Sequence, residues 1–111
     1  MGMFDEVVCD FPLPRSMERF QDRTFQTKGL QYPCEMTLFK IEANGTLSRR
    51  GHDKVWEFNF EPDEPFTFYT PIDTKTMAYN KAGWVEFEAT FEGKLIKSLT
   101  VYRHVPVGGT R

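Results

Sequence analysis

The sequence predicts a mainly β fold, an antiparallel meander of about six strands that forms a small sandwich or a partly open barrel with little helix. The chain is rich in aromatic residues, with 11 Phe, 4 Tyr and 2 Trp, and these residue types favour half-buried pleated surfaces. Short runs that alternate between apolar and polar residues are separated by turn residues throughout the chain. No segment carries the apolar period of a long amphipathic helix.

The first part of the chain predicts one strand, one short turn and one extended segment. Residues 4–9 form the first strand, which Pro12 and Pro14 end because proline lacks an amide donor. Residues 16–22 predict a single helical turn with Ser16 as its cap. Residues 24–28 are expected to be extended.

The middle of the chain predicts a hairpin followed by a further strand. The segments 34–42 and 46–50 flank Asn44-Gly45, and this dipeptide tolerates the positive φ angles of a tight hairpin turn. Residues 54–60 then alternate, which places Trp56, Phe58 and Phe60 on one face and predicts that they lie in the core.

The last part of the chain predicts a strand, a long loop and a second hairpin. A strand covers residues 66–70, and the polar segment 72–83 is expected to be a loop. The segments 84–91 and 94–104 form the hairpin, with Phe87 and Phe91 directed to the core. We expect a single domain over residues 1–111, with 105–111 as a frayed tail.

Composition limits the class of partner. The formal net charge is −2, from 14 basic and 16 acidic residues. The chain as a whole therefore lacks the basic footprint that favours nucleic acid, which we do not expect as the main partner. No apolar run approaches the ~20 residues that span a bilayer, so no membrane association is expected. The acidic N-terminus and two cysteines indicate a cytoplasmic protein in a reducing compartment.

Metal binding and catalysis have little support in the sequence. The cysteines and histidines (Cys9, Cys34, His52 and His104) are isolated from one another, whereas zinc ligands usually come in close pairs. We therefore predict no structural metal, no cofactor and no disulfide. Neither a nucleophile–base motif nor a Gly-rich phosphate loop is present, which predicts a protein without enzymatic activity and without catalytic residues.

The strongest candidates for a binding site are aromatic residues outside the core pattern. Tyr69 is out of phase with Phe66 and Phe68, and Trp84 shares its strand parity with two glutamates. Tyr and Trp on an outer face are typical interface anchors. The predicted protein-binding residues are Tyr69, Tyr79, Trp84, Glu86 and Glu88.

A second hypothesis uses the basic cluster that follows the first hairpin. Arg49, Arg50 and Lys54 could contact phosphate if the fold is a small barrel that binds a nucleotide or single-stranded nucleic acid through its aromatic residues. A flat patch of Tyr69, Tyr79 and Trp84 would favour a protein partner. A groove that combines aromatic residues with Arg49, Arg50 and Lys54 would favour nucleic acid.

Several segments resemble a family of short hypothetical proteins of tailed phages and bacterial prophages. They are Met1-Gly2-Met3-Phe4-Asp5, Phe11-Pro12-Leu13-Pro14, Phe25-Gln26-Thr27-Lys28, Phe68-Tyr69-Thr70, Trp84-Val85-Glu86-Phe87 and Gly93-Lys94-Leu95. Some sequences of that family carry a Cys-Pro-x-Cys knuckle near the start, which is absent here because Asp10-Phe11-Pro12-Leu13 follows a lone Cys9. The resemblance implies a phage or prophage origin and supplies no catalytic residues.

Together these observations predict a non-catalytic phage or prophage accessory protein that binds a bacterial protein in the host cytoplasm. One concrete form is inhibition of a host defence complex, in the manner of an anti-CRISPR protein. The identity of the partner, the oligomeric state and the order of the strands stay open at this point.

Overall fold

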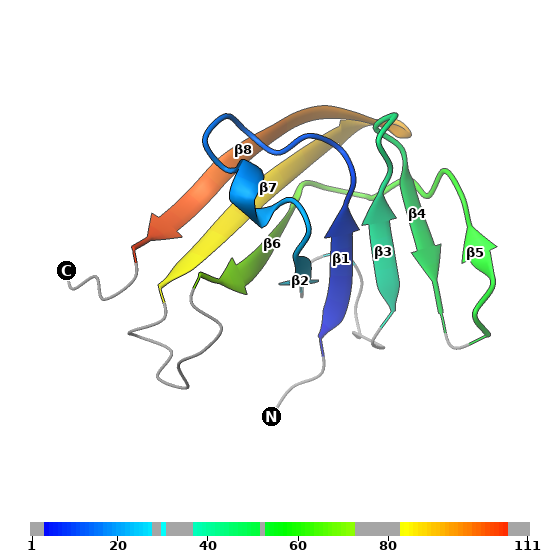
Figure 1. The fold of residues 1–111 in the computed structure, drawn as a ribbon. Coiled ribbons are helices and arrows are strands. Elements are labelled where there is room, and N and C mark those ends of the chain that lie inside the picture. Colours follow the sequence, from blue (N-terminus) through cyan, green and yellow to red (C-terminus); the bar gives the residue numbers. More distant parts are fainter. Residues whose placement is uncertain (1–3, 28–29, 31–36, 52, 73–82, 107–111) are drawn as a thin grey trace.

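The computed structural model describes residues 4–27, 30, 37–51, 53–72 and 83–106, and these residues form one open mixed sheet of eight strands (Figure 1). The order across the sheet is β5-β4-β3-β1-β2-β6-β7-β8. The predicted mainly β fold with little helix is confirmed. The strands are β1 (Asp5–Cys9), β2 (Thr24–Thr27), β3 (Leu38–Ile41), β4 (Leu47–Arg50), β5 (Trp56–Glu57), β6 (Phe66–Pro71), β7 (Trp84–Glu92) and β8 (Leu95–Val105), and a 3-10 turn, η1, covers Glu18–Phe20.

Strand β1 joins two antiparallel meanders. On one side it pairs in parallel with β3, the first strand of the meander β3-β4-β5. On the other side it pairs antiparallel with β2. Strand β2 in turn pairs antiparallel with β6, the first strand of the meander β6-β7-β8. The sheet is therefore antiparallel except for the β1–β3 pair, where Val7 lies opposite Phe39.

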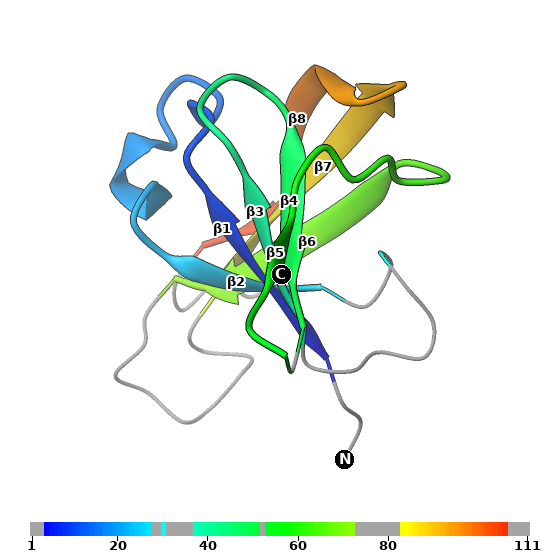
Figure 2. The same cartoon turned by 90° about the vertical axis from the view of Figure 1, so that its right-hand side faces the viewer.

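Both predicted hairpins are confirmed over their described residues, as β3-β4 and β7-β8, and their turns lie against each other; residues 34–36 of the first expected hairpin lie outside the described residues. Gly45 ends the first turn with a φ of +92°, a conformation that glycine adopts without a steric penalty. The second hairpin pairs Phe91 with Ile96 and Glu92 with Leu95. The Ile96 amide donates a hydrogen bond of 2.8 Å to the Gly45 carbonyl. This contact curls the sheet toward a barrel at one end, while the sheet as a whole stays open (Figures 1 and 2).

The core lies on the inner face of the curled sheet. β6 and β7 alternate strictly between buried and partly exposed residues along most of their length. Phe25, Phe68 and Phe87 come from three neighbouring strands, and the Phe25 ring meets the other two edge to face, with centroids 5.0 and 5.8 Å away. The buried apolar residues are Val7, Cys9, Leu13, Phe20, Phe25, Phe39, Ile41, Leu47, Phe66, Phe68, Val85, Phe87 and Ala89.

The segment between β1 and β2 is fixed by the Gln21 side chain. Its amide nitrogen donates to the carbonyls of Cys9 and Phe11, and its oxygen accepts from the Leu13 amide. The expected helical turn is present as η1, but Ser16 does not cap it. The residue that precedes η1 is Met17 without a side-chain cap, and Ser16 adopts a φ of +77°.

The expected strand over residues 54–60 is shortened to two residues, and its core assignment is partly wrong. Lys54 and Asn59 adopt φ angles of +60° and +57°, which interrupt an extended strand at both ends. Phe58 is 65% exposed, so its placement in the core is contradicted. Trp56 lies partly exposed on the face away from the core, whereas Phe60 is partly buried and packs against Phe39.

The remaining expectations fall partly outside the described residues. Phe87 is fully buried, as predicted, and Phe91 is partly buried against the core. Most of the expected loop 72–83 lies outside the described residues, and so does most of the expected tail 105–111, of which Val105 is the last residue of β8.

We predict that Phe87→Ala lowers the free energy of unfolding by roughly 3–5 kcal/mol, because it leaves a cavity beside the rings of Phe25 and Phe68. Phe58→Ala removes the same side chain from an exposed position and should cost less than about 1 kcal/mol. Urea unfolding followed by circular dichroism measures both variants. Equal losses for the two substitutions would contradict the assignment of the two faces.

Candidate functional site

The outer face of the sheet, opposite the core, carries one row of neighbouring residues that crosses all eight strands. Each member lies directly opposite the next in the strand register, and none of them is buried. We call this the outer row. From β5 to β8 its members are Trp56, Arg50, Leu38, Glu6, Gln26, Tyr69, Glu86 and Arg103. Aromatic and charged residues therefore lie at both ends of the row.

The β6-β7-β8 end holds most of the residues predicted to bind a protein. The rings of Tyr69 and Trp84 lie 5.7 Å apart, and the Arg103 guanidinium is 5.9 Å from the Trp84 ring. Glu86 lies between Tyr69 and Arg103 in the register. We call Tyr69, Trp84, Glu86 and Arg103 the Tyr69–Trp84 patch.

The other two residues predicted to bind a protein are Glu88, which the structure describes, and Tyr79, which it does not. Glu88 lies two residues beyond Glu86 on the same face of β7, opposite Thr67 and Thr100, so it borders the patch. Tyr79 lies outside the described residues. Arg103 was missed by sequence reasoning, because its position opposite Glu86 depends on the register shifts in the β7–β8 hairpin.

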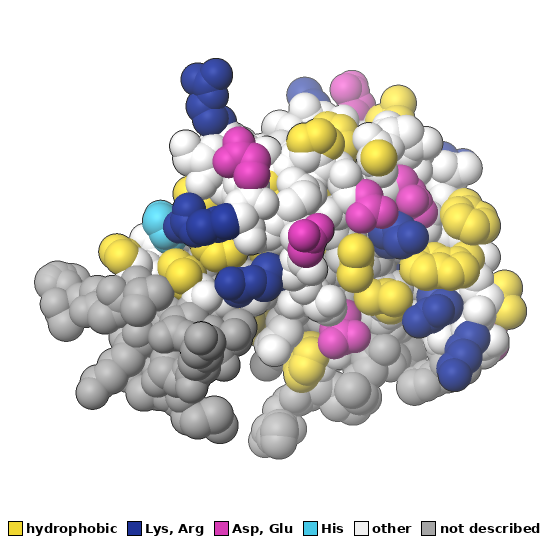
Figure 3. Space-filling view, viewed as in Figure 1, with side chains coloured by type: hydrophobic (Ala, Val, Ile, Leu, Met, Phe, Trp, Pro, Cys, Tyr) yellow, Lys and Arg dark blue, Asp and Glu magenta, His cyan; other side chains and the backbone are white. Residues whose placement is uncertain are grey.

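The β3-β4-β5 end combines aromatic side chains with cations. The rings of Trp56 and Phe58 are nearly parallel, 20° apart in orientation, with centroids 6.4 Å apart. Lys40 Nζ lies 5.1 Å from the Trp56 ring, and Arg50 Cζ lies 5.3 Å from it. We call Trp56, Phe58, Lys40 and Arg50 the Trp56–Phe58 platform. Figure 3 shows hydrophobic, basic and acidic side chains close together over this side of the molecule.

The structure separates the three basic residues of the nucleic-acid hypothesis. Arg50 joins the platform, but Arg49 lies on the other face because successive strand residues alternate. Arg49 forms an ion pair of 2.8 Å with Glu57, and its guanidinium lies 4.3 Å from the Phe60 ring. Lys54 is exposed in the turn before β5. Sequence reasoning missed Lys40, although its alternation with Phe39 and Ile41 already indicated an outward position.

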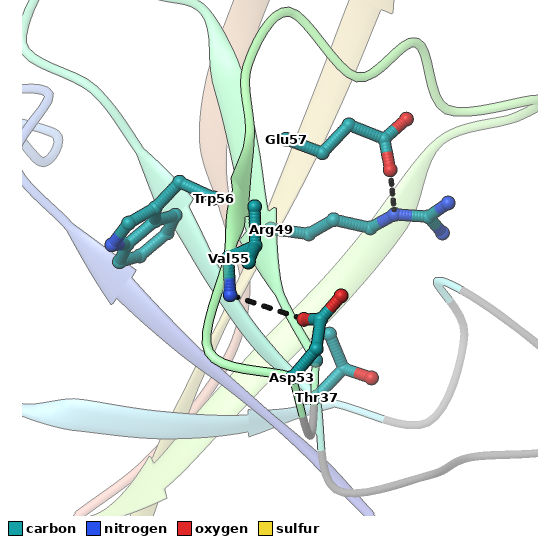
Figure 4. Close-up of a pocket in the computed structure, with 7 residues that line it drawn as sticks. Thr37, Arg49, Asp53, Val55, Trp56 and Glu57 are labelled. Carbon is teal, nitrogen blue, oxygen red and sulfur yellow. Dashed lines mark hydrogen bonds and ion pairs between the residues drawn. The ribbon is translucent and has the colours of Figure 1, made fainter.

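A hollow of about 390 Å³ lies where the turn between β4 and β5 meets the inner side of β4 (Figure 4). Arg49 and Glu57 pair with each other there, and Asp53 Oδ1 accepts a 3.0 Å hydrogen bond from the Val55 amide. The Trp56 ring points away from both charged groups. The Arg49 and Glu57 side chains are thus engaged with each other, and the Asp53 carboxylate is engaged with the backbone.

The described cysteine is not placed for catalysis. Cys9 is fully buried, and its thiol donates a hydrogen bond to the Phe11 carbonyl. Burial raises the pKa of the Cys9 thiol to about 12, so the thiolate is scarce near neutral pH. Cys34 and His52 lie outside the described residues.

Metal-ligand geometry and membrane spans give no further candidate within the described part of the chain. No group of three or more His, Cys, Asp or Glu side chains is placed there to hold a metal ion. Of its helical segments, none is long and apolar enough to cross a bilayer.

No family model, curated protein or solved structure matches the chain. The resemblance to phage and prophage proteins therefore stays an expectation from the sequence. Function has to be inferred from the chemistry of the outer face, where two separate groups of aromatic and charged side chains lie at opposite ends of one row.

We predict that Cys9 resists alkylation in the native protein, because its raised pKa and its burial both suppress reaction. The Cys34→Ser variant leaves Cys9 as the single thiol. Mass spectrometry after treatment with iodoacetamide at pH 8 should show no adduct on the folded chain and one adduct after denaturation. Rapid modification of the folded variant would contradict the buried placement of Cys9.

Proposed function

We propose that this chain is a non-catalytic phage or prophage accessory protein that binds a bacterial protein through the Tyr69–Trp84 patch. The observation that carries the proposal is the pair of rings 5.7 Å apart on the outer sheet face, with Glu86 and Arg103 beside them. The phage origin has its support in the resemblance of the sequence segments alone.

A protein partner suits this patch because of its shape and its side chains. Tyr and Trp contribute large apolar area with few rotatable bonds, and each keeps a polar group that can bond at the rim of an interface. The two rings come from β6 and β7, and β8 continues the sheet beside β7 (Figure 1).

The charges around the rings indicate the chemistry of the partner. Glu86 and Glu88 lie on the same face of β7, whereas Arg103 faces Glu86 from β8. The border of the Tyr69–Trp84 patch is acidic near Glu88, and it carries both a positive and a negative charge where Arg103 lies opposite Glu86. A partner with a basic residue opposite Glu88 would gain association rate and orientation from this arrangement.

Inhibition of a host defence complex is the concrete form of the proposed function. Its support is the combination of a phage resemblance, a binding patch and a described cysteine unsuited to catalysis. A protein of this kind acts by occupying a surface of its target and needs no reacting group of its own.

We predict that Trp84→Ala and Tyr69→Ala weaken partner binding by about 30-fold or more, the loss typical of interface anchors. The partner is first captured from bacterial lysate with the wild-type chain and then used in calorimetric titration. Trp56→Ala serves as the matched control, since it removes an aromatic ring at the other end of the outer row.

Circular dichroism melts of the same variants separate loss of binding from loss of fold. If the folded Trp84→Ala and Tyr69→Ala variants bind the partner as tightly as the wild type, the patch is not the interface.

A further inference from the structure

We propose that the Trp56–Phe58 platform binds single-stranded nucleic acid, with bases stacking on its rings and phosphates contacting its cations. This surface lies at the opposite end of the outer row from the Tyr69–Trp84 patch, so the proposal does not rest on the protein-binding function.

The first observation is the exposure of large apolar side chains at one edge of the sheet. Phe58 is 65% exposed, although Phe25, Phe68 and Phe87 are completely buried, and Val55, which lines the hollow beside Arg49, is 64% exposed. The Phe58 ring lies nearly parallel to the Trp56 ring. Neighbouring exposed apolar side chains of this kind usually mark a binding surface, and flat rings offer a stacking face to any base.

The second observation is the backbone that holds these side chains outward. Lys54 and Asn59 both adopt positive φ angles, a conformation that is unfavourable for lysine and that asparagine adopts more readily than most residues other than glycine. They flank the segment that contains Val55, Trp56 and Phe58. The Val55 amide is further held by Asp53, and the Phe60 amide donates to the Leu47 carbonyl at 2.7 Å. The exposed segment is therefore fixed at both ends.

The third observation is the charge around the rings. Lys40 and Arg50 lie about 5 Å from the Trp56 ring, and Lys54 is exposed two residues before it. The nearest acid on β5, Glu57, points to the other face and pairs with Arg49. Lys40, Arg50 and Lys54 therefore place positive charge close to the rings, whereas Glu42 lies beside Phe58 and Asp53 lies beside Val55.

Polar groups next to Phe58 complete the arrangement. A hollow of about 460 Å³ is lined by Phe58 together with Glu42, Ala43, Asn44, Thr46 and Asn59. The side-chain amides of Asn44 and Asn59 in this hollow can form hydrogen bonds with the edge of a base that stacks on Phe58. A single strand fits this combination better than a duplex, because paired bases do not offer their faces for stacking.

The test is fluorescence anisotropy with labelled single-stranded DNA and RNA homopolymers of about 12 nucleotides, a length within the usual site size. We expect the full chain to bind them at low salt and to release them as salt rises. Phe58→Leu keeps an apolar side chain but removes the ring, and it should weaken binding about tenfold or more. The double variant Lys40→Gln, Arg50→Gln should weaken binding and flatten its salt dependence.

Two matched controls isolate the platform. Lys97→Gln removes one positive charge at an exposed position of β8, and it should weaken binding less than Arg50→Gln alone. Trp84→Ala removes a ring at the Tyr69–Trp84 patch and should leave oligonucleotide binding unchanged. A loss of partner-protein binding in Trp84→Ala with oligonucleotide binding intact would separate the two surfaces.

The proposal is overturned if neither homopolymer binds at low salt, if Phe58→Leu binds as well as the wild type, or if duplex DNA binds more tightly than single strands. Capture of a protein that requires Phe58, without oligonucleotide binding, would assign the platform to a protein partner instead and would also overturn it.

Discussion

The pairing of β1 on both of its sides is the constraint on which the rest of the structure depends. Its antiparallel ladder to β2 and its parallel ladder to β3 join two meanders that would otherwise be separate sheets. Its inward side chains, Asp5, Val7 and Cys9, are fully buried. Its outward residue Glu6 links Leu38 to Gln26, so the outer row is continuous only because β1 holds this register.

Successive residues of a strand face opposite sides of the sheet. The side chains that stabilise the core therefore lie on one face, and most side chains of the proposed binding surfaces lie on the other. The inner face carries the edge-to-face contacts of Phe25 with Phe68 and Phe87. The outer face carries side chains that the core does not need, and they include the members of both proposed binding surfaces. These surfaces lie at opposite ends of one row, on the terminal three strands at each side. One chain could therefore hold a protein and a nucleic acid at the same time without the two sharing a residue.

The local features of the fold could be predicted from the sequence because they depend on neighbouring residues. Asn44-Gly45 specifies a hairpin turn, and the alternation around Phe87 specifies which face of β7 is buried. The parallel pairing of β1 with β3 depends on contacts between distant segments, which no local pattern encodes. Phe58 was misassigned because the positive φ of Asn59 breaks the alternation that the sequence suggests. The parity of Tyr69 and Trp84 indicated one face, but their adjacency needed the register of β6 with β7.

Native-state hydrogen exchange tests the central position of β1 most directly, because the most slowly exchanging amides mark the strands that open only on global unfolding. The architecture predicts that the hydrogen-bonded amides of β1 exchange with the free energy of global unfolding, together with those of β2 and β3. The amides at the free edge of β8 should exchange much faster. If β1 instead exchanged through a local opening while β6 and β7 stayed protected, β1 would be a peripheral strand and the proposed continuity of the outer row would be wrong.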